Sequence, residues 1–136
     1  MLLHLMALLL LVLAAAPASR AEEGILSWHS DIVVERSGDL VVTETIVVRA
    51  LGQVIKRGIY RDIPRLLTTK FGLKAKKPFE VLSVLRDRKK ENYRTEDIGR
   101  GGLRIRIGER SVILEPGIYT YQITYRTGRQ LYFEEE

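Results

Sequence analysis

Short stretches of this chain alternate between apolar and polar residues, and turn-forming residues separate them. The alternation is clearest in 40–49, where every second side chain is apolar except for Glu44. In 118–126 the same period puts four large side chains on one face, namely Tyr119, Tyr121, Ile123 and Tyr125. Because successive side chains of a β-strand point to opposite faces, this period predicts strands with one buried face.

The pattern predicts about seven strands, at 28–35, 40–49, 54–63, 79–86, 103–107, 112–114 and 118–126, with room for a further short strand around 92–95. Residues 36–39 supply the turn of a hairpin, and 65–78 read as a loop. Phe79, Val81, Ser83 and Leu85 are expected to share one face of their strand. No helical period of 10–15 residues separates the strands. The expected fold class is therefore all-β, an antiparallel β-sandwich that is immunoglobulin-like or related.

The first 21 residues differ from the rest of the chain. Residues 5–16 are an apolar run of about twelve, which fits a secretory signal peptide and is shorter than the roughly 20 residues of a membrane-spanning helix. Ser19 and Ala21 are small residues at the positions that cleavage after Ala21 would require. We therefore expect a signal peptide at 1–21 and one exported β-sandwich domain at 22–136. An uncleaved anchor is the alternative interpretation.

Charge is unevenly distributed along the chain. Residues 54–110 carry 17 basic and seven acidic side chains, whereas 22–53 carry two basic and six acidic ones. A basic centre between acidic ends favours an anionic partner, and a solvated surface with no partner is the alternative. Nucleic acid is not expected, because the basic stretches lack the interleaved aromatic residues of a stacking platform.

Catalytic chemistry has little support in the sequence. The chain has no cysteine, which excludes disulfides, thiolate zinc sites, iron–sulfur clusters and thiol catalysis. His29 is followed by Asp31 on the same strand face, but two ligands do not make a metal site, and beyond the leader no second histidine could complete one or build a serine-type triad. We expect no enzymatic activity, no catalytic residue, no metal, no cofactor and no small-molecule substrate.

Glu44 is the exception on the apolar face of its strand. A buried carboxylate without a partner costs several kcal/mol, so we expect Glu44 to form an ion pair with Arg57 or Arg61. Both arginines lie in 56–64, which holds three cations, one tyrosine and one aspartate before Pro64. This segment has two interpretations, a recognition loop or an ion-paired strand that locks one sheet to the other.

A cationic surface is the second candidate feature. Arg104 and Arg106 share the outward face of one predicted strand. If that face lies beside 57–61, a contiguous surface for an anionic partner results, made of Arg57, Tyr60, Arg61, Arg104 and Arg106. Such a surface would suit anionic lipid headgroups or acidic wall polymers.

Several of these segments also carry a resemblance to a known family. Residues 25–32, 38–46, 57–64 and 116–125 resemble, in order, the N-terminal domain of an uncharacterised bacterial family of predicted membrane proteins, the domain of unknown function 2207. The stretch Arg-Gly-Ile-Tyr-Arg-Asp-Ile-Pro at 57–64 is the most specific. The resemblance implies an extracytoplasmic domain after a signal peptide, with membrane-spanning helices further along in typical members. The family has no established activity, so no catalytic residues carry over.

These observations predict a non-catalytic extracytoplasmic binding or structural module of the bacterial envelope. Its expected partner is a membrane surface or another envelope protein. It would be membrane-associated if the chain continues beyond Glu136, and secreted otherwise. The alternative is the non-catalytic front end of a larger membrane-anchored envelope enzyme or transport component.

Overall fold

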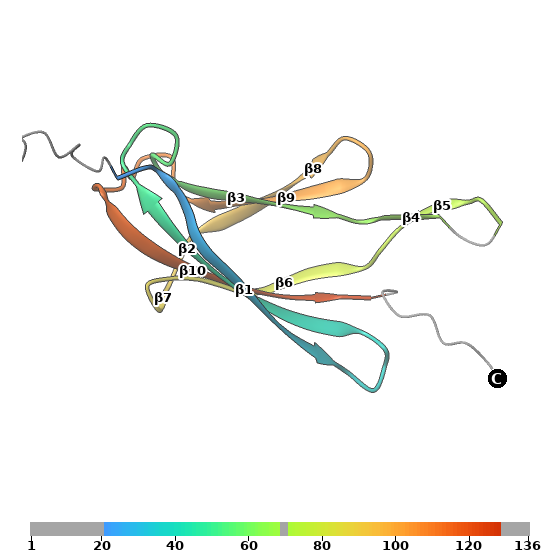
Figure 1. Ribbon diagram of the computed structural model, residues 1–136. Helices are drawn as coiled ribbons and strands as arrows, with labels where there is room; N and C mark the ends of the chain where they lie inside the picture. The colour runs from blue at the N-terminus through green and yellow to red at the C-terminus, as the bar shows by residue number, and fades with distance from the viewer. Residues whose placement is uncertain (1–20, 69–70, 129–136) are drawn as a thin grey trace, which may run out of the picture.

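The computed structural model describes residues 21–68 and 71–128 of the 136-residue chain. Residues 1–20 of the expected signal peptide and the last eight residues of the chain therefore lie outside the described part. Within that part the protein is built from β-strands, and every strand pairing is antiparallel (Figure 1).

Two sheets form the body of the domain. The large sheet has the order β1-β2-β10-β6-β7, with β1 at Gly24–Val34, β2 at Leu40–Ala50, β10 at Gly117–Thr127, β6 at Phe79–Arg86 and β7 at Lys89–Lys90. The small sheet has the order β3-β9-β8, with β3 at Gly58–Pro64, β9 at Gly102–Gly108 and β8 at Tyr93–Ile98. A hairpin of β4 (Leu66–Thr68) and β5 (Lys74–Lys76) projects from one end (Figure 1).

The expected all-β antiparallel fold is confirmed, and seven of the ten strands have six or more residues. Several details differ from expectation. Strand β1 begins at Gly24, ahead of the expected start at 28, and residues 54–57 precede β3 without forming a strand. The expected loop at 65–78 contains the β4–β5 hairpin. Residues 112–114 form no strand, because a turn closes from Val112 N to Glu109 O and buried Leu114 donates its N–H to Lys56 O.

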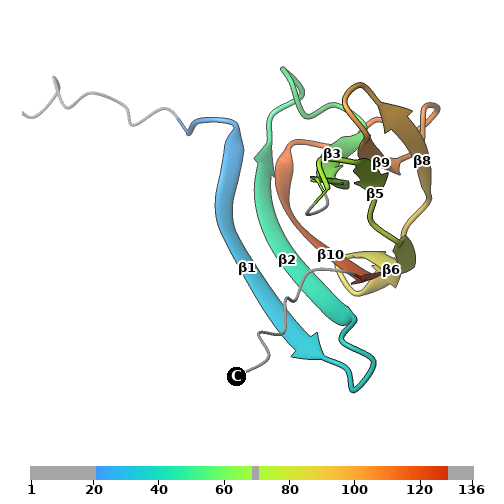
Figure 2. The ribbon, with the colours of Figure 1, turned by 90° about the vertical axis from the view of Figure 1, so that its right-hand side faces the viewer.

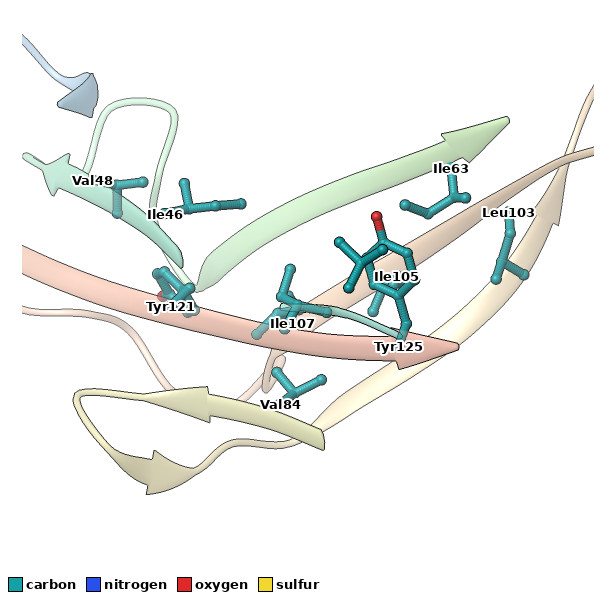
Figure 3. Close-up of a cluster of buried hydrophobic side chains, with 11 residues drawn as sticks. Ile46, Val48, Ile63, Val84, Leu103, Ile105, Ile107, Tyr121 and Tyr125 are labelled. Carbon is teal, nitrogen blue, oxygen red and sulfur yellow. The ribbon is translucent and has the colours of Figure 1, made fainter. Parts of the chain in front are cut away.

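The hydrophobic core fills the space between the two sheets. From the large sheet, β2 and β10 bury alternate side chains, and Tyr121 lies opposite Ile46 while Tyr125 lies opposite Val42. The small sheet contributes Ile63, Leu103, Ile105 and Ile107 from the facing side (Figure 3). Each such side chain stabilises the fold by roughly 1.5–3 kcal/mol when fully buried. This apolar burial holds the two layers together.

Strand β6 changes face partway along. Its pairing with β10 shifts register between Ser83, which lies opposite Thr124, and Val81, which lies opposite Tyr125, so Leu82 is the extra residue of a β-bulge. Phe79 and Val81 pack against the core before the bulge, and Val84 is buried after it. The expectation that Phe79, Val81, Ser83 and Leu85 share one face was therefore wrong, because a bulge reverses the alternation.

Two glycines allow β3 and β9 to meet closely at one end of the small sheet. Gly58 lies opposite Gly108, and their φ angles are 145° and 112°. A Cβ atom on Gly58 would lie 1.8 Å from the carbonyl oxygen of Ile107, and one on Gly108 would lie 2.0 Å from that of Arg57. Only glycine fits these two positions.

A carboxylate orders the loop after β2. Glu23 accepts hydrogen bonds from the backbone N–H groups of Leu51 at 2.8 Å, Val54 at 2.6 Å and Ile55 at 3.1 Å. Desolvation alone would raise the pKa of Glu23, but the backbone hydrogen bonds together hold this pKa below its ordinary value. The loop that carries Val54 and Ile55 is thereby fixed beside the start of β1.

Candidate functional site

Glu44 and Arg61 form a buried bridge between the two sheets. Glu44 lies on the core-facing side of β2 and is 3% exposed. Arg61, on β3, donates from Nε to Oε2 of Glu44 at 2.6 Å and from Nη2 to Oε1 at 2.7 Å. Both carboxylate oxygens are thus satisfied by one planar guanidinium, the geometry in which an ion pair is strongest. Of the two partners expected from the sequence, Arg61 is the one that meets Glu44.

Two aromatic side chains complete this bridge. The hydroxyl of Tyr125 on β10 donates to Oε1 of Glu44 at 3.0 Å, and the guanidinium of Arg61 lies 4.7 Å from the ring centroid of Trp28 on β1. Burial raises the pKa of Tyr125 to about 12, and the Glu44 charge adds to this effect. Burial alone would lower the pKa of Arg61, but the hydrogen bonds and charge of Glu44 raise it above its ordinary value. The bridge therefore joins four strands, β1, β2, β3 and β10.

Arg57 lies elsewhere, at the glycine-paired end of the small sheet. Its Nε donates to the backbone carbonyl of Arg110 at 2.8 Å. Its side chain therefore anchors the segment after β9 and leaves Glu44 to Arg61. Of the two expected arginines, Arg61 links the two sheets through Glu44 and Arg57 does not.

The outer face of the small sheet carries Tyr60, Arg104 and Arg106 together. Arg104 makes a bidentate pair with Asp62, with both distances 2.7 Å, and Arg106 pairs with Glu96 at 2.6 Å. Hydrogen bonds from Arg104 and Arg106 hold the pKa values of Asp62 and Glu96, respectively, below their ordinary range. Both arginines also lie over the ring of Tyr60, at 5.1 and 4.5 Å from its centroid.

The structure therefore divides the cationic surface expected from the sequence. Tyr60, Arg104 and Arg106 lie together, but Asp62 and Glu96 neutralise the two arginines. Arg61 points to the opposite side of the sheet, toward Glu44. The alternation within β3 explains this, because adjacent residues of a strand face opposite sides.

A cleft of about 950 Å³ opens between β1, at the edge of the large sheet, and β3, at the edge of the small one. One wall is apolar, with Ile25, Trp28, Val54 and Ile55 among its side chains. Four cations with no carboxylate within ion-pair distance in the described part of the chain also line it, namely Lys56, Arg57, Arg94 and Arg110.

Sequence reasoning missed most of this cleft. Lys56 and Arg57 were part of a recognized basic segment, but Arg94 and Arg110 come from other segments and reach the cleft only through the pairing of β3, β9 and β8. One signal was available, because 54–110 hold most of the basic residues of the chain. The sequence alone does not show which of these basic residues lack a carboxylate partner in the fold.

No metal centre is found among the described residues, since no group of three or more histidine, cysteine, aspartate or glutamate side chains comes together there. His29 and Asp31 meet as a pair, with Nε2 3.2 Å from Oδ1, and both side chains are exposed. Residues 21–68 and 71–128 include no helix long and apolar enough to cross a membrane.

Replacing Glu44 with glutamine should lower the free energy of unfolding by about 1–3 kcal/mol, because Arg61 would lose its charged partner inside the sandwich. Urea denaturation of the wild type and Glu44→Gln measures this change. Arg104→Gln is a control, since the Arg104–Asp62 pair is more exposed and should be worth less. An unchanged midpoint for Glu44→Gln would contradict the prediction.

The two buried tyrosines of β10 should respond differently to loss of the hydroxyl. The Tyr125 hydroxyl bonds Glu44, whereas the buried Tyr121 hydroxyl has no hydrogen-bond partner within the described residues. We expect Tyr125→Phe to cost about 1.5–3 kcal/mol and Tyr121→Phe to be neutral or stabilising. Thermal denaturation of the two variants compares them directly. Equal losses of stability in the two variants would show that the hydrogen bond from Tyr125 to Glu44 adds no stability of its own.

Comparison with known proteins identifies the family of the chain. Residues 24–136 match the family described as the predicted membrane protein (DUF2207) N-terminal domain. The uncharacterized protein YciQ of Escherichia coli (strain K12) is 34% identical over 105 residues, which are 77% of this chain and 16% of that protein. No solved structure matches. The chain belongs to the family of predicted membrane proteins that share the DUF2207 N-terminal domain.

Proposed function

We propose that this domain is a non-catalytic extracytoplasmic binding module whose cleft receives the anionic headgroup of a membrane lipid. The observation that carries the proposal is the cleft itself, where an apolar wall with Trp28 lies beside the unpaired cations Lys56, Arg57, Arg94 and Arg110. A phospholipid offers both features that this lining would bind, a negative phosphate and the apolar start of its acyl chains. Membership of a membrane protein family supports a lipid as the anion that the domain meets.

Electrostatics supports an anion rather than a neutral ligand. Arg61 and Arg106 also line the cleft, but Glu44 and Glu96 already neutralise them. Two carboxylates line it as well: Asp62 pairs with Arg104, whereas Glu109 pairs with no cation among the described residues and offsets one of the four unpaired cations. The remaining four cations would each gain about 1 kcal/mol near an anionic lipid surface, an attraction that salt screens.

The apolar wall supports contact with the interfacial region of a membrane. Trp28 is 49% exposed and Val54 is 86% exposed, although both are large hydrophobic residues. Indole rings are favoured at membrane interfaces because one part of the ring is apolar and the N–H is polar. Trp28 also stacks on Arg61, so the bridge to Glu44 holds the indole at the cleft.

Among the described carboxyl groups, three have pKa values that shift away from the range a general acid or base needs. A general acid or base needs a pKa near the working pH. The pKa values of the carboxyl groups of Glu23, Asp62 and Glu96 are lowered, away from neutrality. Burial raises the pKa of Tyr121 to about 12, as it does for Tyr125.

The alternative, a non-catalytic front end of a membrane-anchored enzyme or transport component, is a further proposal about the whole protein, since this chain matches 16% of its relative.

Binding to vesicles tests the proposal. We expect the purified chain to co-sediment with vesicles of phosphatidylglycerol and phosphatidylcholine, and not with phosphatidylcholine alone. The double variant Arg57→Gln/Arg110→Gln should bind the anionic vesicles at least about tenfold more weakly, since it removes two cleft cations worth roughly 1 kcal/mol each.

The matched control is Arg88→Gln/Lys90→Gln, which removes the same net charge from exposed positions outside the cleft. This control should keep most of the binding. Equal losses in the two double variants would mean that only net charge matters. Equal binding to neutral and anionic vesicles would also contradict the proposal.

A further inference from the structure

The first strand of the large sheet leaves one edge open. β1 has eleven residues and pairs with β2 on one side, and no other described strand pairs with it on the other. In Figure 2, β1 forms the rim of the large sheet and the small sheet lies away from it, over the opposite part. The backbone N–H and C=O groups along this rim are therefore a template for another strand.

The side chains of β1 protect this edge only weakly. Exposed edges are usually guarded by lysine, proline, other charged side chains or bulges, and β1 has no lysine, arginine or proline, so that its guards are Asp31 and the bulge at Leu26. On the face that β1 shares with the core side of β2, Trp28, Ile32 and Val34 are 49%, 58% and 57% exposed. An edge that is both unpaired and apolar is typical of an interaction surface.

We propose that β1 pairs with β1 of a second copy of this chain, in antiparallel fashion about a two-fold axis at Ser30. The bulge at Leu26, where the register shifts between Ile25 and Ser27, limits the regular strand to Ser27–Val34. An axis at Ser30 pairs the stretch from Ser27 to Val33 with itself and stops just before the bulge. This inference is independent of the proposed lipid binding.

The side chains of this register complement one another. Trp28 lies opposite Ile32 of the second copy, an aromatic and β-branched pair of the kind that stabilises sheets. On the other face His29 lies opposite Asp31 of the second copy, so each carboxylate gains a second imidazole besides the one that it contacts within its own strand at 3.2 Å. Ser30, small and uncharged, lies on the axis. The five central positions of the pairing thus meet compatible partners, and the outermost pair joins Ser27 to Val33.

Neighbouring registers are poorer. An axis at Asp31 would place two carboxylates directly opposite each other, which is destabilising. An axis at His29 would pair only Ser27 to Asp31 and would leave Ile32 without a partner, because Leu26 is bulged. The Ser30 register is the longest pairing that avoids like charges.

This arrangement would join two large sheets into one ten-stranded sheet. A two-fold axis perpendicular to a sheet keeps equivalent faces on the same side. The apolar face of β1, with Trp28 and Ile32, would thus become a continuous strip across both copies. Both clefts would open toward the same side of the dimer.

Disulfide cross-linking tests this register, and the chain suits it because it has no cysteine of its own. The 136-residue chain itself is used, because it contains no competing thiol. Residues directly opposite in an antiparallel pair have Cα atoms about 4.5–5.5 Å apart, within the range that a disulfide can span. On oxidation, Ser30→Cys should therefore give a covalent dimer that reducing agent reverses.

Ser27→Cys is the matched control, because it changes the same residue type on the same exposed strand. In the Ser30 register the two Ser27 positions are six residues apart along the strand, roughly 20 Å, and cannot be bridged. We expect at least about tenfold more dimer from Ser30→Cys than from Ser27→Cys. Co-expressed Ser27→Cys and Val33→Cys chains should cross-link to each other, since these positions lie opposite.

Three outcomes would overturn the proposal. Absence of any dimer from Ser30→Cys, in a variant whose solubility and abundance match the wild type, would show that the edges do not meet in this register. Equal cross-linking of Ser30→Cys and Ser27→Cys would show random collision. An adduct of Ser30→Cys with a different protein would show that another partner covers the edge.

Discussion

Glu44 sets a constraint on which the rest of the domain depends. Its carboxylate lies within an otherwise apolar face of β2, where an unpaired charge would cost several kcal/mol. Arg61 has to cross from the small sheet to meet it, and Tyr125 adds a third polar contact. Apolar burial supplies most of the attraction between the sheets, but it is not directional. The bridge selects which residue of β3 faces β2.

That choice determines which side chains of β3 lie on the outer face of the small sheet. With Arg61 directed inward, alternation sends Tyr60 and Asp62 outward, where they meet Arg106 and Arg104 across the β3–β9 pairing. The outer face is therefore ion-paired and nearly neutral. Four cations without a carboxylate partner among the described residues, Lys56, Arg57, Arg94 and Arg110, lie around the cleft, which the glycine pair Gly58–Gly108 and the Glu23-bound loop help to shape. The same bridge thus organises the core and fixes which side chains of β3 reach the outer face.

Local patterns in the sequence predicted much of the fold. Alternation identified 40–49, 103–107 and 118–126 correctly, and the lone Glu44 on an apolar face pointed to a partner in 57–61. The β6 bulge was missed because one inserted residue leaves no local signal in the sequence. The nearly neutral outer face and the cleft depend on the register of β3 against β9, whose paired residues are 38 to 50 positions apart in the chain, and periodicity cannot fix that register. The family match covers residues 24–136, a range that includes all ten strands.

A double-mutant cycle between Glu44 and Arg61 tests the central claim most directly. Free energies of unfolding would be measured for wild type, Glu44→Gln, Arg61→Gln and the double variant. If the bridge holds the sheets in register, the two substitutions should be strongly coupled, by about 2 kcal/mol or more, because the second removes a group that the first has already left unpaired. Losses that add to within about 0.5 kcal/mol would mean that the two residues act independently, and would contradict this account.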